Sequence, residues 1–87
     1  MSVVEKYRNL KETYPVQLLL IKQGDFYEAF GLDAEIMARE LQITLQICRQ
    51  VTPPISNIGI PYHALQRYLD LLDSQGYSCE VVESWPT

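Results

Sequence analysis

The stretch from residue 16 to residue 30 constrains the fold of this chain more than any other. "VQLLLIK" at 16–22 is a short, almost continuous apolar run, which is typical of a strand covered on both faces. Gly24-Asp25 is a turn signal, and "FYEAF" at 26–30 has the aromatic content of a second strand. Two strands joined by so short a turn predict an antiparallel pair within a larger sheet.

Helical and extended patterns alternate along the rest of the chain. Ser2 and Glu5 form a capping box that opens a helix, and Pro15 ends it. The remaining segments are a helix over 34–41, a strand over 42–50, a loop at 52–54, a strand or extended segment over 55–60, a helix from Pro61 to a C-terminal cap at Gly76, and a strand over 77–83. In the 42–50 strand, alternation predicts Ile43, Leu45 and Ile47 on one half-buried side.

The order α-β-β-α-β-β-α-β predicts an α+β (mixed α/β) fold, with helices packed on a mixed β-sheet. The chain has 87 residues, which is enough for one small domain over 1–87. The N-terminus is charged and resembles no signal peptide, and the longest apolar run, "LLLI" at 18–21, is too short to cross a membrane. We therefore expect a cytoplasmic protein with no membrane partner, in which Cys48 and Cys79 stay reduced.

Composition and motifs limit the function classes. A net charge of −4 argues against a dedicated basic nucleic-acid binder, although it does not exclude a module that other domains hold on nucleic acid. The chain has no phosphate-binding glycine loop, no H-E-x-x-H and no C-x-x-C. We therefore expect no enzyme activity, no catalytic or metal-binding residues and no cofactor in this chain.

"GDFYEAF" at 24–30 combines three aromatic and two acidic residues in seven positions. Strand alternation places Phe26, Glu28 and Phe30 on one side and Tyr27 with Ala29 on the other. An exposed ring beside a carboxyl group can wedge against a nucleobase and hydrogen-bond to it.

Two other interpretations of this segment stay open from the residues alone. Phe26 can be a core ring, the more common position for phenylalanine, with Glu28 at the rim and Asp25 in the turn. A metal site at Asp25 and Glu28 is the weaker alternative, because no third ligand lies nearby in the sequence.

Together with "DAEIMARELQITL" and "GIPYHALQRYLDLLDSQGYS", this segment resembles the N-terminal mismatch-recognition domain, domain I, of the MutS family of DNA mismatch-repair proteins. The resemblance runs from about Tyr7 to about Glu83. It implies that Phe26 wedges against a mispaired base from the minor groove while Glu28 hydrogen-bonds that base, with Tyr27 pointing inward. We expect Lys22 and Arg49 to flank the wedge and reach phosphates of a mismatched or distorted double-stranded DNA. From the residues alone, the alternative that both side chains are simply solvated stays open.

The chain departs from the family pattern in several places. Lys22 and Gln23 stand where the family has Arg and an apolar residue, "ISN" precedes "GIPYHA" where "PMA" is usual, and "CEVVESWPT" replaces an "AICEQ"-like strand. A full family member continues into connector, lever, clamp and ATPase domains, so ATP and Mg²⁺ would concern only a larger protein. Met1 and the altered C-terminus favour a free-standing relative over an excised fragment. The alternative function is an adaptor that keeps the fold, has lost DNA recognition and docks to repair or mobile-element proteins.

Overall fold

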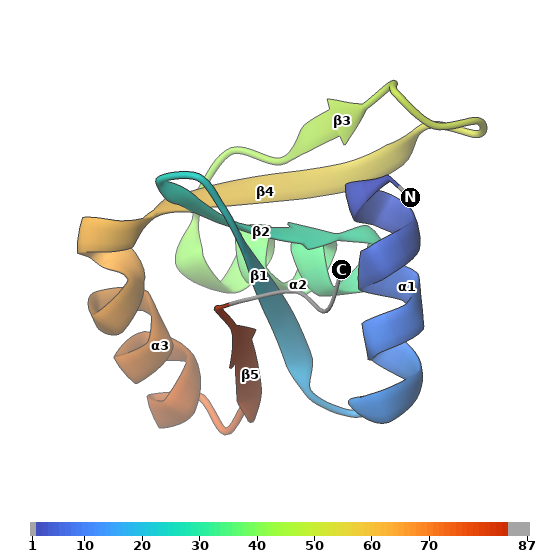
Figure 1. The fold of residues 1–87 in the computed structure, drawn as a ribbon. Coiled ribbons are helices and arrows are strands. Elements are labelled where there is room, and N and C mark those ends of the chain that lie inside the picture. The colour runs from blue at the N-terminus through green and yellow to red at the C-terminus, as the bar shows by residue number, and fades with distance from the viewer. Residues whose placement is uncertain (1, 84–87) are drawn as a thin grey trace.

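The computed structural model describes residues 2–83, which form a five-stranded sheet and three α-helices (Figure 1). In chain order the elements are α1 (Val3–Thr13), β1 (Leu18–Gln23), β2 (Phe26–Phe30), α2 (Gly31–Leu41), β3 (Gln46–Cys48), β4 (Ile55–Pro61), the 3₁₀ turn η1 (Tyr62–Ala64), α3 (Leu65–Ser74) and β5 (Cys79–Val82). The predicted order of elements and the predicted α+β class are both confirmed.

The sheet is mixed, with the strand order β3-β4-β2-β1-β5. β1 pairs antiparallel with β2, as the turn signal predicts, and parallel with β5. β4 pairs antiparallel with both β2 and β3. Cys48 on β3 and Cys79 on β5 therefore lie at opposite edges, about 19 Å apart at the usual strand spacing, too far for a disulfide.

The helices divide the two faces of the sheet between them (Figure 1). α1 lies on one face, where its Tyr7 ring packs edge-on against the Phe30 ring at 5.3 Å between centroids. α2 contacts β2 and β4 from the other face, and α3 packs against α2 and β5. Side chains that point toward α2, among them Tyr27, Ala29 and Ile58, are buried. No helix within residues 2–83 is long and apolar enough to cross a membrane.

Local signals at the helix ends behave as predicted, with one shift. Ser2 accepts a hydrogen bond from the Glu5 backbone N–H at 3.2 Å, which confirms the cap of α1. Gly76, with φ +92°, follows α3, and the backbone N–H groups of Gly76 and Tyr77 close the helix on the carbonyls of Asp73 and Leu72. Pro61 does not begin a helix; it is the last residue of β4, and the 3₁₀ turn starts one residue later.

The prediction for residues 42–50 is wrong in length and in burial. The strand covers only Gln46–Cys48, and Leu45 and Ile47 are 40% and 49% exposed. β3 is an edge strand that pairs with β4 alone, so alternating apolar residues there have little to pack against. Ile43 is half-buried and does pack against the core.

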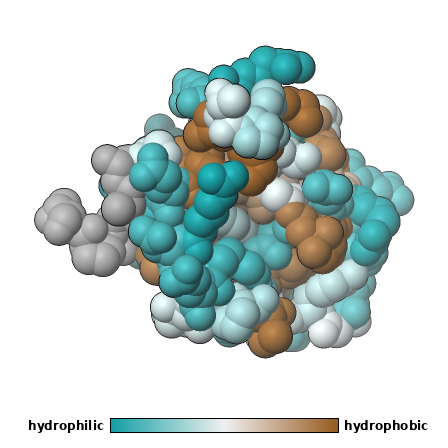
Figure 2. Space-filling view, turned by 90° about the vertical axis from the view of Figure 1, so that its right-hand side faces the viewer, coloured by the Kyte–Doolittle hydropathy of each residue, from teal (hydrophilic) through white to brown (hydrophobic). Residues whose placement is uncertain are grey.

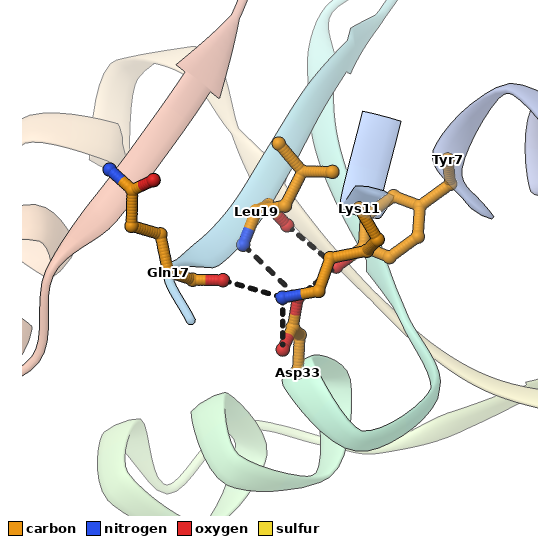
Figure 3. A network of polar contacts seen from close by, with 5 residues as sticks. All are labelled: Tyr7, Lys11, Gln17, Leu19 and Asp33. Carbon is orange, nitrogen blue, oxygen red and sulfur yellow. Dashed lines mark hydrogen bonds and ion pairs between the residues drawn. The ribbon is translucent and has the colours of Figure 1, made fainter. Parts of the chain in front are cut away.

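A buried polar network holds α1 on the sheet (Figure 3). Asp33, in the first turn of α2 and only 7% exposed, accepts a hydrogen bond from the Leu19 backbone N–H at 3.2 Å and pairs with Lys11 at 3.0 Å. The Tyr7 hydroxyl lies 2.6 Å from the Asp33 carboxylate and 2.9 Å from the Leu19 carbonyl, and it has one proton to donate between them. Lys11 also donates to the Gln17 carbonyl at 2.6 Å. The network joins α1, β1 and α2 at one point.

Candidate nucleic-acid interface

The tip of the β1–β2 hairpin sets the direction of every side chain around it. Gly24 has φ +61° at the first position of a two-residue turn, a conformation that favours glycine there. The turn places Gln23 directly opposite Phe26 and Lys22 directly opposite Tyr27. Because directly opposed residues share a face, Gln23 lies beside Phe26, whereas Lys22 points to the other side of the sheet.

The helix α1 covers only part of its face of the sheet. Phe30, Ile21 and Leu19 are buried on this face, with Tyr7 of α1 packed against Phe30. Toward the hairpin tip and across to β4, the same face is uncovered. We call this region the open half-face; its residues are exposed or half-buried and comprise Gln23, Phe26, Glu28, Asn57 and Gly59.

Phe26 is the aromatic residue of the open half-face. Its side chain is 49% exposed, whereas Tyr27 is 6% exposed and turned toward the core. The prediction that Phe26 is partly exposed on the same side as Glu28, with Tyr27 inward, is confirmed, and the interpretation of Phe26 as a core ring is wrong. The ring leans over Gly59 on β4, where a Cβ would lie 3.7 Å from Phe26 Cδ1. Gly59 therefore provides an open floor beside the ring.

Glu28, two residues along β2 from Phe26, is half-buried and lines a hollow of about 350 Å³. The N-terminal turn of α1 forms one wall through Val3, and Gln23, Arg49 and Asn57 contribute polar groups to the lining. Burial raises the pKa of the Glu28 carboxyl above its ordinary value. Within residues 2–83, Glu28 has no ion-pair partner that would oppose this shift.

The two cations predicted to flank the ring lie in different places. Arg49, on the exposed segment after β3, lines the same hollow as Glu28. Lys22 lies on the opposite face, beside a smaller hollow of about 200 Å³ that Tyr27 and Tyr62 also line. The structure thus places Glu28 and Arg49 at one hollow, with Phe26 two residues from Glu28 on the same face, whereas Lys22 lies on the opposite face. A phosphate contact by either cation stays a prediction.

Two residues of the open half-face were missed by the sequence reasoning. Gln23 and Asn57 both contribute to the Glu28 hollow. Gln23 had a signal in the sequence, because a two-residue turn at Gly24-Asp25 makes it the direct partner of Phe26. Asn57 had none, since its position depends on the pairing of β4 with β2, which are separated by α2 and β3.

One other hollow on the surface of the described residues is less suited to DNA. A larger hollow of about 530 Å³ lies between α3 and β5, but it is lined by the acidic side chains of Asp70 and Asp73, which would repel phosphate. Among residues 2–83, no three His, Cys, Asp or Glu side chains are grouped as metal ligands. Figure 2 views the side that carries α1 and shows hydrophobic surface in separate patches, with hydrophilic surface between them. Such a surface does not favour a broad apolar interface with another protein.

Comparison with known proteins is consistent with this geometry. The family model described as MutS domain I matches residues 1–87. A protein of Desulfovibrio desulfuricans named DNA mismatch repair protein MutS is 46% identical over 83 residues, which cover 91% of this chain and 9% of that protein. Proteins of the same name from Nitratidesulfovibrio vulgaris and Lawsonia intracellularis are 45% and 40% identical, over 84 and 87 residues. The chain spans about a tenth of the length of these relatives.

Proposed function

Because this chain belongs to the MutS domain I family, we propose that it binds double-stranded DNA at a mismatched or distorted base pair through the open half-face. The observation that carries the proposal is the half-exposed Phe26 ring beside the half-buried Glu28 carboxyl. One group is placed to enter the base stack and the other to hydrogen-bond a base edge. Neither side chain is part of the hydrophobic core.

The ring would act as a wedge from the minor groove. Inserting an apolar side chain between base steps kinks the duplex and costs a few kcal/mol of unstacking. The cost is smallest at a mispaired base, which is already held less firmly than a paired one. Phe26 therefore gains most where pairing is defective, and this difference is the basis of recognition.

Glu28 would add a hydrogen bond to the mispaired base. Its pKa is already raised by burial in the protein, and the negative potential of nearby phosphates raises it further. In the complex the carboxyl is then able to hold its proton and donate a hydrogen bond, rather than repel the DNA. Arg49 on the rim of the same hollow is placed to neutralise a phosphate.

The chain alone would bind weakly. Seven Lys and Arg residues are outnumbered by eleven acids, so phosphate neutralisation contributes little. We expect a dissociation constant of roughly 10⁻⁴ to 10⁻⁶ M at physiological salt, as for non-specific binding. The proposal includes no catalytic activity and no cofactor for this chain. In a longer protein, further DNA contacts would raise the affinity through effective concentration.

The test is a fluorescence anisotropy titration of matched duplexes and duplexes with one G·T mismatch, over a series of salt concentrations. The wild-type chain should prefer the mismatch, and affinity should fall as salt rises. Phe26→Ala should lose the preference, since a stacked ring is worth about 1–3 kcal/mol, roughly 5- to 150-fold. The salt-dependent background should remain.

Leu71→Ala, which truncates a similarly exposed apolar side chain on α3, serves as the matched control and should keep the preference. Glu28→Gln should retain binding if the carboxyl acts in its protonated form. Absence of any mismatch preference in the wild type, even at low salt, would refute the proposal. That result would favour the alternative, an adaptor that contacts a protein partner.

A further inference from the structure

Gln23 is the polar residue that lies directly beside Phe26 across the β1–β2 hairpin. The two-residue turn makes it the residue directly across the hairpin from Phe26, at the last position of β1. The residue that flanks Phe26 on its other side, Pro61 on β4, carries no side-chain hydrogen-bonding group. Gln23 is thus the one direct cross-strand neighbour of Phe26 within residues 2–83 that can donate and accept hydrogen bonds through its side chain.

The carboxamide of Gln23 is available to a ligand. The side chain is exposed and lines the hollow that contains Glu28. No hydrogen bond within residues 2–83 occupies the carboxamide. Glu28 lies two residues along the strand from Phe26 and Gln23 lies across the hairpin from it, so the two polar residues border Phe26 on different sides.

The spacing suits two neighbouring base pairs. Side chains directly opposite each other on an antiparallel pair have Cβ atoms about 4.5–5.5 Å apart. Successive nucleotides along a strand of B-DNA are about 3.4 Å apart, and more at a step opened by a wedge. With the Phe26 ring in one step, Gln23 would be within reach of the minor-groove edge of the flanking pair.

We propose that Gln23 reads the base pair beside the mismatch, by accepting a hydrogen bond from the N2 amino group of guanine through its carboxamide oxygen. This inference rests on the proposed function of the open half-face and extends it to sequence context. The guanine N2 amino group is the only donor that bases present in the minor groove, and it distinguishes G·C from A·T pairs. Mismatches flanked by G·C should therefore bind more tightly than the same mismatches flanked by other pairs.

Inosine provides the probe, because it lacks only the N2 amino group of guanosine. Mismatched duplexes carrying G·C or I·C at the flanking pairs would be titrated against wild-type protein, Gln23→Leu and Gln66→Leu. Gln66 is an exposed glutamine on α3, away from the hairpin, and serves as the matched control. Circular dichroism melts would verify that all three proteins fold.

In the wild type, replacing guanine with inosine should weaken binding about 2- to 12-fold, the equivalent of one net hydrogen bond. Gln66→Leu should show the same loss. Gln23→Leu should bind the two duplexes equally, because it no longer has an acceptor for the amino group.

Two results would overturn the inference while leaving the proposed function intact. One is a wild type that prefers mismatches but is indifferent to inosine. The other is Gln23→Leu losing as much as the wild type on inosine substitution. A wild type without any mismatch preference would refute the proposed function, and this inference with it.

Discussion

Replacing Asp33 tests whether a single buried carboxylate holds α1 in place on the sheet. Asp33→Ala removes the acceptor shared by the Tyr7 hydroxyl, the Leu19 N–H and Lys11. Tyr7 retains the Leu19 carbonyl at 2.9 Å and Lys11 retains the Gln17 carbonyl at 2.6 Å. The Leu19 N–H loses the Asp33 partner.

The magnitude follows from these losses. An unsatisfied buried N–H costs about 1–3 kcal/mol, and hydrogen bonds to a charged acceptor contribute about 1.5–3 kcal/mol each. Loss of the Lys11–Asp33 ion pair adds less than the roughly 3–5 kcal/mol typical of a fully buried pair, because the Lys11 side chain is 26% exposed. We expect Asp33→Ala to lose about 3–5 kcal/mol of unfolding free energy. For 87 residues the total is roughly 4–13 kcal/mol, so this is a large share.

Urea denaturation followed by far-ultraviolet circular dichroism measures the effect. The midpoint should fall while the slope of free energy against urea stays unchanged. Asp33→Asn, which keeps one acceptor oxygen, should lose less than Asp33→Ala. Asp70→Ala, which removes an exposed carboxylate that accepts a hydrogen bond from Gln66, should change stability by no more than about 0.5 kcal/mol. A loss below about 1 kcal/mol in Asp33→Ala would refute this account of the network.

Three further predictions concern the strands of the open half-face. Phe30→Ala should cost about 3–5 kcal/mol of stability, because the Phe30 ring is 3% exposed. Phe26→Ala should cost about 1 kcal/mol, because the Phe26 ring is 49% exposed. Similar urea midpoints for the two variants would contradict this. Gly24→Ala should lower stability by about 1–2 kcal/mol, because residue 24 has a φ of +61°. Gly59→Ala should be tolerated, because the added Cβ would lie at an ordinary contact distance of 3.7 Å from Phe26. Thermal melts compare the two variants, and equal losses of stability would show the reasoning to be wrong. Since burial raises the pKa of Glu28, wild-type stability should fall as pH rises from the ordinary glutamate pKa of about 4.3 through the raised pKa of the folded protein. Glu28→Gln should then be more stable than the wild type at pH 7, and the difference in stability should disappear below about pH 4. A difference that does not depend on pH would exclude this cause.

Local chemistry in the sequence was sufficient for the elements and for the direction of the central side chains. The capping box at Ser2, the turn at Gly24 and the cap at Gly76 each act within a few residues, so they could be recognised without knowing the fold. Strand alternation likewise placed Phe26 and Glu28 on one side and Tyr27 on the other. The half-exposure of Phe26 was expected from the family resemblance, since alternation alone does not say which side is covered.

Contacts between distant segments decided the rest. Only the strand order shows that residues 46–48 form an edge strand, where Leu45 and Ile47 stay exposed. The residues around Tyr7 do not indicate its hydrogen-bond partner Asp33, which is 26 positions away. The extent of the open half-face depends on where α1 lies on the sheet, and the buried network of Tyr7, Lys11 and Asp33 holds α1 in place. Periodicity describes the faces of single elements, whereas the free energy that selects their neighbours comes from non-local pairing and burial.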